Sequence, residues 1–264
     1  MTATRSFSVL IVGGGSGGLG VAARLAAVLP PGSVAVVEPS DKHYYQPLWT
    51  LVGGGVFPKE ITERAEADYI PDGVVWIRDR VAEFAPEHKQ IVTAGGERLG
   101  YDQLVVALGI QLDWHKIDGV TDALGTGGVC SNYRYDLVDS TWQTLRTITD
   151  GNAIFTFPST PVKCAGAPQK IMYLADEHLR RLGVRETSTI TFASAGAAIF
   201  GVKHYREALE PIVARKSIET RFRHDLVGVR PKSREAIFRH LDEKKEVVLP
   251  YDFLHVVPPQ SAPD

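Results

Sequence analysis

The chain has 264 residues, and its 29 lysines and arginines against 31 aspartates and glutamates give a formal net charge of −2. A charge this close to zero argues against a dedicated nucleic-acid-binding protein, which usually carries a strongly basic domain. Hydrophobic residues make up 44% and charged residues 23%, as in an ordinary folded globular protein. Two cysteines cannot form a disulfide framework, although they could still serve redox chemistry.

A strand pattern begins within the first ten residues, so we expect no secretory signal or transit peptide. The longest apolar runs, such as residues 104–108, are far shorter than the ~20 residues of a membrane-spanning helix. The sequence therefore predicts a cytoplasmic protein, or one bound peripherally to the inner face of a membrane. A mitochondrial location would require a longer N-terminus.

The first part of the chain alternates between strand and helix patterns. Residues 7–12 and 34–37 are short, apolar, β-branched runs, as in strands that are buried on both faces. Between them, residues 19–29 carry alanine and leucine at helical spacing and end at a Pro-Pro-Gly stop signal. This order of strand, helix and strand predicts a right-handed βαβ unit and a parallel sheet.

The later elements predict a second lobe of the same kind. The first lobe continues with short strands of antiparallel character and then a buried strand: residues 74–77, 80–84, 90–93 and 101–109. After a glycine-rich stretch, the second lobe alternates strand, helix, strand and helix: residues 153–157, 167–182, 189–193 and 202–214. A meander at the sheet edge and a last strand are expected to follow: residues 220–223, 235–238, 246–249 and 253–257. We expect an α/β fold of two Rossmann-like lobes, residues 1–112 and 113–264.

The strongest local motif is Gly13-x-Gly15-x-x-Gly18, which follows the first strand and opens the first helix. Such glycines allow a tight turn, close approach of a pyrophosphate and close helix–strand packing, while the helix N-terminus attracts the phosphates. Glu38 follows at the end of the next strand, where an acidic residue binds the adenosine ribose. The motif therefore predicts a bound dinucleotide.

FAD is the dinucleotide that the rest of the sequence favours. Glu38 disfavours NADP, whose 2′-phosphate it would repel. The strand at residues 101–109 ends in Ala-Leu-Gly109, which resembles the Ala-Thr-Gly strand end of flavoproteins with two dinucleotide-binding folds. In the second lobe, neither residues 158–168 nor residues 193–198 form a GxGxxG motif, so a nicotinamide donor is poorly supported.

Cys164 is the candidate for redox chemistry. Free cysteines are often merely buried, but this one lies between a strand end and a helix start, with Lys163 beside it and Lys170 nearby. A helix N-terminus and ammonium neighbours favour the reactive thiolate. Cys130 follows two glycines and could be structural. The histidines lack metal-ligand spacing such as HExxH, so no metal site is expected.

Several blocks of the sequence resemble the mitochondrial-type branch of the sulfide:quinone oxidoreductases, within the FAD-dependent pyridine nucleotide-disulfide oxidoreductase superfamily. They include the glycine motif, the His-Tyr-Tyr-Gln-Pro-Leu-Trp stretch at residues 43–49 and the Pro-Val-Lys-Cys-Ala-Gly-Ala-Pro stretch at residues 161–168. The resemblance runs almost end to end, and the cysteine block is specific to it. It implies a set of FAD-binding residues: Gly13, Gly15, Ser16, Gly17, Gly18, Glu38, Gln46, Val81 and Gly109.

The resemblance also implies the chemistry. Cys164 would be one of two cysteines that accept the sulfur of sulfide, leaving a persulfide that passes sulfur to a small acceptor. The other cysteine would become a thiolate that gives electrons to FAD, and quinone would take them onward. Relatives then return to the FAD domain with a segment that carries the partner cysteine and faces the membrane. This chain stops at Asp264, before that segment, so we expect a truncated form.

Three alternatives remain open at this stage. Cys130 could serve as the partner of Cys164 in place of a cysteine from the return segment. The protein could instead be an FAD-dependent NADH dehydrogenase, although the missing second glycine motif weighs against it. It could also be a catalytically inactive nucleotide-binding subunit that serves interaction or assembly, as the early end of the chain suggests.

Overall fold

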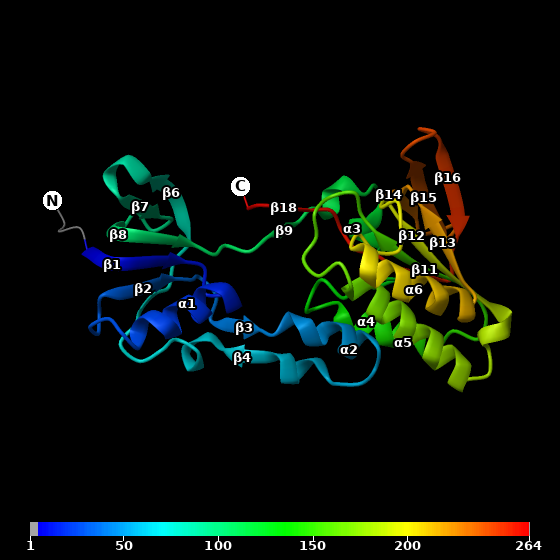
Figure 1. Ribbon diagram of the computed structural model, residues 1–264, viewed down its shortest axis with the longest axis horizontal. Helices are drawn as coiled ribbons and strands as arrows, with labels where there is room; N and C mark the ends of the chain where they lie inside the picture. Colours follow the sequence, from blue (N-terminus) through cyan, green and yellow to red (C-terminus); the bar gives the residue numbers. More distant parts are fainter. Residues whose placement is uncertain (1–4, 264) are drawn as a thin grey trace. The chain divides into compact units, whose positions relative to one another are not determined.

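The computed structural model describes residues 5–263, which form two compact units (Figure 1). The first unit comprises the described residues of Met1–Tyr45, Ile61–Ile110 and Ala262–Asp264. The second comprises Gln46–Glu60 and Gln111–Ser261. The α/β class expected from the alternating patterns is confirmed in both units, which are described one at a time.

A six-stranded sheet forms the first unit, in the order β5-β2-β1-β8-β7-β6. Its strands are β1 (Arg5–Val12), β2 (Val34–Val37), β5 (Val75–Ile77), β6 (Val81–Ala85), β7 (Gln90–Thr93) and β8 (Arg98–Val106). Strand β1 pairs in parallel with β2 and β8, and helix α1 (Ser16–Ala26) connects β1 to β2. The expected βαβ unit is therefore present. A separate ribbon pairs β3 (Lys42–Tyr44) with β4 (Glu63–Ala65).

One pairing in this unit differs from the sequence expectation. Strand β5 was expected to be antiparallel, like β6 and β7, but it pairs in parallel with β2, with Ala35 opposite Val75. The long connection between β2 and β5 allows the chain to cross over and enter the sheet in the same direction. Strands β6 and β7 are antiparallel, as expected.

The second unit is built around a parallel five-stranded sheet, in the order β10-β17-β11-β12-β13. Its strands are β10 (Val129–Cys130), β11 (Gly151–Phe157), β12 (Ser188–Ser194), β13 (Ile218–Phe222) and β17 (Phe253–His255). Helix α5 (Ala167–Arg181) connects β11 to β12 and packs on both strands, and α6 (Lys203–Arg215) connects β12 to β13 (Figure 1). Two Rossmann-type crossovers therefore follow one another.

The expected meander was wrong in its arrangement. Strand β13 joins the parallel sheet instead, and a separate antiparallel sheet contains β14 (His224–Arg230), β15 (Glu235–His240) and β16 (Glu246–Pro250). The prediction had no strand at β14, although Leu226 and Val229 are buried in the core that also holds Phe238. Between β13 and β15, apolar and polar residues alternate too weakly along the sequence to predict a strand.

Smaller elements complete the second unit, and the sequence patterns did not predict most of them. They are α2 (Trp49–Gly53), α3 (Val120–Ala123), α4 (Val138–Leu145) and the two-stranded ribbon of β9 (Gln111–Leu112) with β18 (Gln260–Ser261). Val138, Trp142 and Leu145 have the spacing i, i+4, i+7, a signal that would have predicted α4. Helix α2 packs against α4 and α5, which explains why residues 46–60 belong to this unit. No helix in the described part of the chain is long and apolar enough to cross a membrane.

Candidate functional site

The glycine loop between β1 and α1 needs glycine at two positions for steric reasons. Gly13 has φ 104°, and a Cβ there would lie 2.3 Å from the carbonyl oxygen of Ala107. A Cβ on Gly18 would lie 1.9 Å from the carbonyl oxygen of Gly13. These contacts hold α1 close to β1 and β8, so the first and last glycines of the motif maintain the local fold.

The middle of the same loop is open. A Cβ on Gly15 would meet no atom within 4 Å, and one on Gly17 would meet only the Ala107 methyl group at 3.9 Å. Helix α1 begins at Ser16 with no side-chain cap and no acidic residue in its first turn. Its free N–H groups and the space above them suit a pyrophosphate. This loop therefore fits the dinucleotide that the sequence predicts.

Glu38 lies beside this loop at the end of β2. One carboxylate oxygen accepts a hydrogen bond from the Gly14 N–H at 2.8 Å, and the other accepts one from the Ser40 N–H at 2.8 Å. The indole N–H of Trp76 donates to the Glu38 carbonyl oxygen at 2.9 Å. The carboxylate is thus fixed at the loop, where it could bind a ribose hydroxyl.

The remaining predicted FAD contacts lie at separate places. Val81 begins β6 and is half-buried, and Gly109 follows β8 with φ 73° and open space around its Cα. Gln46 belongs to the second unit, where it lines a cavity beside Cys164. The roles of these three residues in FAD binding stay predictions.

Sequence reasoning missed an acidic residue that is buried near the glycine loop. Glu66 is 1% exposed, and one of its carboxylate oxygens lies 3.2 Å from Nδ1 of His43. A Cβ on Gly14 would lie 2.5 Å from its other oxygen, Oε1, which has no hydrogen-bond partner. Burial raises the pKa of Glu66, and the nearby Glu38 carboxylate adds to the rise. Nothing in the local sequence distinguished Glu66 from a surface glutamate.

Cys164 lies in the loop between β11 and α5, as the sequence predicted. Its thiol is exposed and its backbone has φ 57°, a left-handed conformation that is uncommon for a residue with a side chain. The Lys170 ammonium, on the first turns of α5, lies 3.8 Å from the Cys164 sulfur. The exposed thiol therefore lies within hydrogen-bonding distance of a cationic side chain.

A small cavity of about 120 Å³ lies against Cys164 within the second unit. Lys163 lines it, and partial desolvation lowers the pKa of its ammonium to about 8 while attraction to Cys164 acts the other way. The Lys163 ammonium also lies 5.8 Å from the ring centroid of Trp49, within range of a cation–π contact. The cavity thus combines apolar walls, a thiol and two ammonium groups.

Cys130 is placed quite differently. It is fully buried in β10, and its thiol donates to the carbonyl oxygen of Leu254 at 3.6 Å. Burial raises the pKa of this thiol to about 12, so it is protonated and unreactive near neutral pH. Both cysteines are free in the structure. Cys130 is therefore a core residue, and its position does not favour the pairing with Cys164 that the sequence left open.

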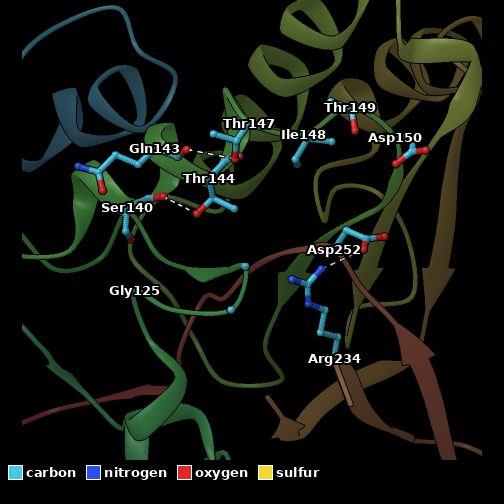
Figure 2. Close-up of a pocket in the computed structure, with 12 residues that line it drawn as sticks. Gly125, Ser140, Gln143, Thr144, Thr147, Ile148, Thr149, Asp150, Arg234 and Asp252 are labelled. Carbon is cyan, nitrogen blue, oxygen red and sulfur yellow. Dashed lines mark hydrogen bonds and ion pairs between the residues drawn. The ribbon is translucent and has the colours of Figure 1, made fainter. Parts of the chain in front are cut away.

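A larger cavity, of about 480 Å³, lies at the other end of β11 (Figure 2). Polar side chains line it, but they are largely committed to other groups. The hydroxyls of Ser140 and Thr144 donate to backbone carbonyls of their own helix region, and the Arg234 guanidinium pairs with Asp252 at 3.4 Å. Neither cysteine lines this cavity, whereas Cys164 lines the smaller one.

Comparison with known proteins identifies the family. Residues 7–156 match the family model described as Pyridine nucleotide-disulphide oxidoreductase. The chain is 46% identical to the mitochondrial sulfide:quinone oxidoreductase of Mus musculus over 264 residues, covering 100% of the chain and 59% of that relative. It is 46% identical to the mitochondrial sulfide:quinone oxidoreductase of Dictyostelium discoideum over 255 residues, covering 96% of the chain and 56% of that relative. The chain thus spans less than two thirds of the length of these relatives.

A solved structure agrees in fold. The sulfide:quinone oxidoreductase from the hyperthermophilic bacterium Aquifex aeolicus matches with a TM-score of 0.81 at 18% identity, over 98% of this chain and 60% of that one. At this identity the match concerns the fold alone. The family model, however, covers more than half of the chain, so the chain belongs to the pyridine nucleotide-disulphide oxidoreductases, a family of FAD-dependent enzymes, as the sequence resemblance predicted.

Proposed function

We propose that this protein is a sulfide:quinone oxidoreductase in which Cys164 takes part in sulfur transfer. The observation that carries the proposal is the Cys164 thiol itself, exposed, 3.8 Å from the Lys170 ammonium and open to a cavity that Lys163 lines. The two relatives at 46% identity, both named sulfide:quinone oxidoreductase, support the same reaction. FAD, bound at the glycine loop, supplies the two-electron redox step.

The proposed reaction balances as a thiol–disulfide exchange. Hydrosulfide attacks a disulfide formed by Cys164 and a second cysteine, so that a new S–S bond forms and the old one breaks. One cysteine becomes a persulfide and the other a thiolate. A small nucleophilic acceptor removes the outer sulfur. Re-forming the disulfide would release two electrons, which FAD held at the glycine loop would accept for transfer to quinone. The quinone step would place the protein at a membrane surface.

The second cysteine of the pair is proposed to come from outside the described chain. Cys130 is the other cysteine of this sequence, and it is committed to the core through β10 and its bond to Leu254. Moving it to Cys164 would break the pairing of β10 with β17, in which Cys130 lies opposite His255. This chain covers 59% and 56% of the two relatives, so the partner cysteine could lie in the part of such a protein that this chain does not cover.

The test uses a longer version of the protein that includes the segment carrying the second cysteine, and it measures reduction of a water-soluble quinone by the FAD-loaded form with sodium hydrosulfide or NADH as the electron donor. We expect turnover with hydrosulfide, and loss of that turnover in Cys164→Ser. Cys130→Ser is the matched control, because it removes the same sulfur from a buried position that takes no part in the proposed exchange. Reduction by NADH and not by hydrosulfide would overturn the proposal in favour of an NADH dehydrogenase.

A second measurement follows the sulfur atom. After treatment with hydrosulfide and quinone, mass spectrometry should find one added sulfur on the peptide that contains Cys164 and none on the peptide that contains Cys130. Added sulfur on neither peptide, together with full quinone reduction, would contradict a role for Cys164. A protein that binds FAD but is inert with both donors would instead support a binding or assembly subunit.

A further inference from the structure

Three buried residues beside Cys164 have polar atoms that bind nothing in the structure. Asn132 is 7% exposed, Tyr133 is 6% exposed and His255 is 1% exposed. The unpartnered atoms are both amide atoms of Asn132, the hydroxyl of Tyr133 and Nδ1 of His255. All three residues line the cavity of about 120 Å³ that Cys164 also lines. A buried polar group without a partner destabilises a fold, so such a cluster points to a ligand.

The hydrogen bonding of His255 fixes which of its ring nitrogens carries the proton. Its Nε2 lies 3.2 Å from the backbone nitrogen of Asn132, and because a backbone N–H can only donate, Nε2 is the acceptor. Burial lowers the pKa of His255 to about 3, so the ring is neutral near neutral pH. The single ring proton is therefore on Nδ1. This N–H is a donor that lacks an acceptor.

Tyr133 provides a second donor. Burial raises the pKa of its hydroxyl, and the negative charge of a Cys164 thiolate raises it further, so the O–H keeps its proton. The side-chain amide of Asn132 can donate as well. The ammonium groups of Lys163 and Lys170 also line the cavity. No aspartate or glutamate is among its lining residues, all of which lie in the described part of the chain. The cavity thus presents donors and positive charge, which is the environment of an anion.

The cavity is small, with a volume of about 120 Å³. Its walls include Trp49 and Pro47, which suit a weakly hydrated, polarisable ion more than a strongly hydrated one.

We propose that this cavity binds a small sulfur anion beside Cys164, held by the Tyr133 O–H and the His255 Nδ1–H. The anion is either free hydrosulfide or the outer sulfur of a persulfide on Cys164, which present the same charge and the same acceptor. This inference deepens the proposed function, because it names the residues that hold the sulfur while Cys164 exchanges it. Neither donor takes part in electron transfer.

The first test uses Tyr133→Phe and anaerobic calorimetric titration of the protein with sodium hydrosulfide. The Tyr133 hydroxyl has no hydrogen-bond partner among residues 5–263, so its removal should leave the melting temperature unchanged or raise it. Hydrosulfide affinity should nevertheless fall about tenfold, the effect of one hydrogen bond to a charged group. Tyr251→Phe is the matched control, since its hydroxyl is also buried and unpartnered but lies outside this cavity.

The second test distinguishes the hydrogen-bonding roles of the two ring nitrogens of His255. His255→Gln retains an acceptor near the position of Nε2 for the Asn132 N–H but lacks the Nδ1 donor, so we expect it to weaken hydrosulfide binding by about tenfold. His255→Asn places an amide N–H near the position of Nδ1 and should retain most of the binding. If His255 had a purely structural role, His255→Asn would not bind hydrosulfide more tightly than His255→Gln.

Cys164→Ser distinguishes the two sources of the anion. Binding that persists in Cys164→Ser identifies free hydrosulfide. The persulfide sulfur is identified by two results together. Cys164→Ser does not bind hydrosulfide, and the persulfide of the wild-type protein decays faster when Tyr133 is replaced by phenylalanine. The inference is overturned if Tyr133→Phe and His255→Gln both match the wild type in hydrosulfide affinity and in persulfide lifetime. The persulfide on Cys164 is formed with inorganic polysulfide, whose S–S bond supplies sulfur that is already oxidised, so these measurements need no quinone. Loss of quinone reduction alone would therefore contradict only the proposed function.

Discussion

The side-chain carbonyl oxygen of Gln260 accepts a hydrogen bond from the backbone N–H of Lys163 at 2.9 Å. Gln260 is 4% exposed, and its own backbone N–H donates to the Thr160 hydroxyl at 2.9 Å. A residue from β18, almost one hundred positions away, therefore holds the loop that presents Cys164 at two points. Within this loop Cys164 adopts a left-handed backbone conformation, with φ 57°.

Gln260→Leu should release this loop. We expect a loss of about 1 kcal/mol in the free energy of unfolding of the second unit, since a partly buried N–H loses its acceptor. The rate of Cys164 alkylation by iodoacetamide should change at the same time. Gln111→Leu is the control: its side chain donates to Ser261 in the same two-stranded ribbon, so it should affect stability alone. An unchanged alkylation rate in Gln260→Leu would show that the loop holds its conformation without this bond.

Local sequence patterns predicted the elements that carry the site. The apolar run of β2 and the glycine motif have a short-range cause, because the buried strand and the tight turn depend on consecutive residues. The predicted bounds of β2 and β7 match the structure residue for residue. The position of Cys164, before α5 and near Lys170, also followed from a local pattern.

The donor cluster beside Cys164 could not be predicted in this way. Asn132 and Tyr133 follow β10, while His255 ends β17, and only the parallel pairing of these strands brings them together. That pairing joins segments more than one hundred residues apart, and β10 contains only two residues, too few for any periodic signal. The burial of Glu66 has the same explanation, since it depends on how its segment packs under the glycine loop.

Two glycines of the loop, Gly15 with open space around it and Gly18 in close contact with Gly13, lead to two contrasting predictions. Gly15→Ala should leave the free protein stable, because its backbone is extended and a Cβ meets no atom within 4 Å. It should nevertheless weaken FAD binding about tenfold, since the methyl group occupies space needed by the pyrophosphate. Gly18→Ala should instead destabilise the first unit by about 1–3 kcal/mol or more, because the Cβ meets the Gly13 carbonyl oxygen.

Urea denaturation without FAD and fluorescence titration with FAD measure the two effects separately. The prediction is wrong if Gly15→Ala unfolds as readily as Gly18→Ala. Equal FAD affinity of Gly15→Ala and the wild-type protein would show that the pyrophosphate does not lie over this residue. The comparison therefore tests the site independently of any turnover.

Asp176 on α5 holds a buried charge cluster. It is fully buried, and its carboxylate accepts from Arg185 at 2.7 Å, Arg180 at 3.0 Å and Lys216 at 2.6 Å. Burial alone would raise the pKa of Asp176, but these three cations hold it below its usual value. Asp176→Asn leaves the Arg185 guanidinium, itself 7% exposed, without a counterion, and should cost about 3–5 kcal/mol in unfolding free energy.

The lowered pKa also sets a pH dependence. The stabilisation is complete at pH values above the unfolded pKa of about 3.8, and it is lost as the pH falls through the lower folded pKa. The difference in stability between wild type and Asp176→Asn should therefore shrink in strong acid. Asp242→Asn is the control, since Asp242 pairs with Arg223 at the surface and should cost much less. Equal losses for the two variants would contradict a dominant role of burial.

Glu66 has a pKa shifted in the opposite direction. Its folded pKa is raised above the unfolded value of 4.5, chiefly by burial, so the fold binds its proton more tightly than the unfolded chain does. Stability is then lost as the pH rises from about 4.5 through the folded pKa, and the penalty persists at neutral pH. Glu66→Gln removes the charge and retains an oxygen for His43, so it should raise the melting temperature of the first unit at pH 7.

The gain should disappear in acid, where Glu66 is protonated in both the folded and the unfolded chain and resembles glutamine. Melting curves of wild type and Glu66→Gln between pH 4 and pH 8 measure it directly. Glu87→Gln, which neutralises an exposed carboxylate of the same unit, should show no such pH-dependent gain. A lower melting temperature for Glu66→Gln at pH 7 would mean that an ionised Glu66 paired with His43 stabilises the fold, and that attraction to His43 outweighs the cost of burial.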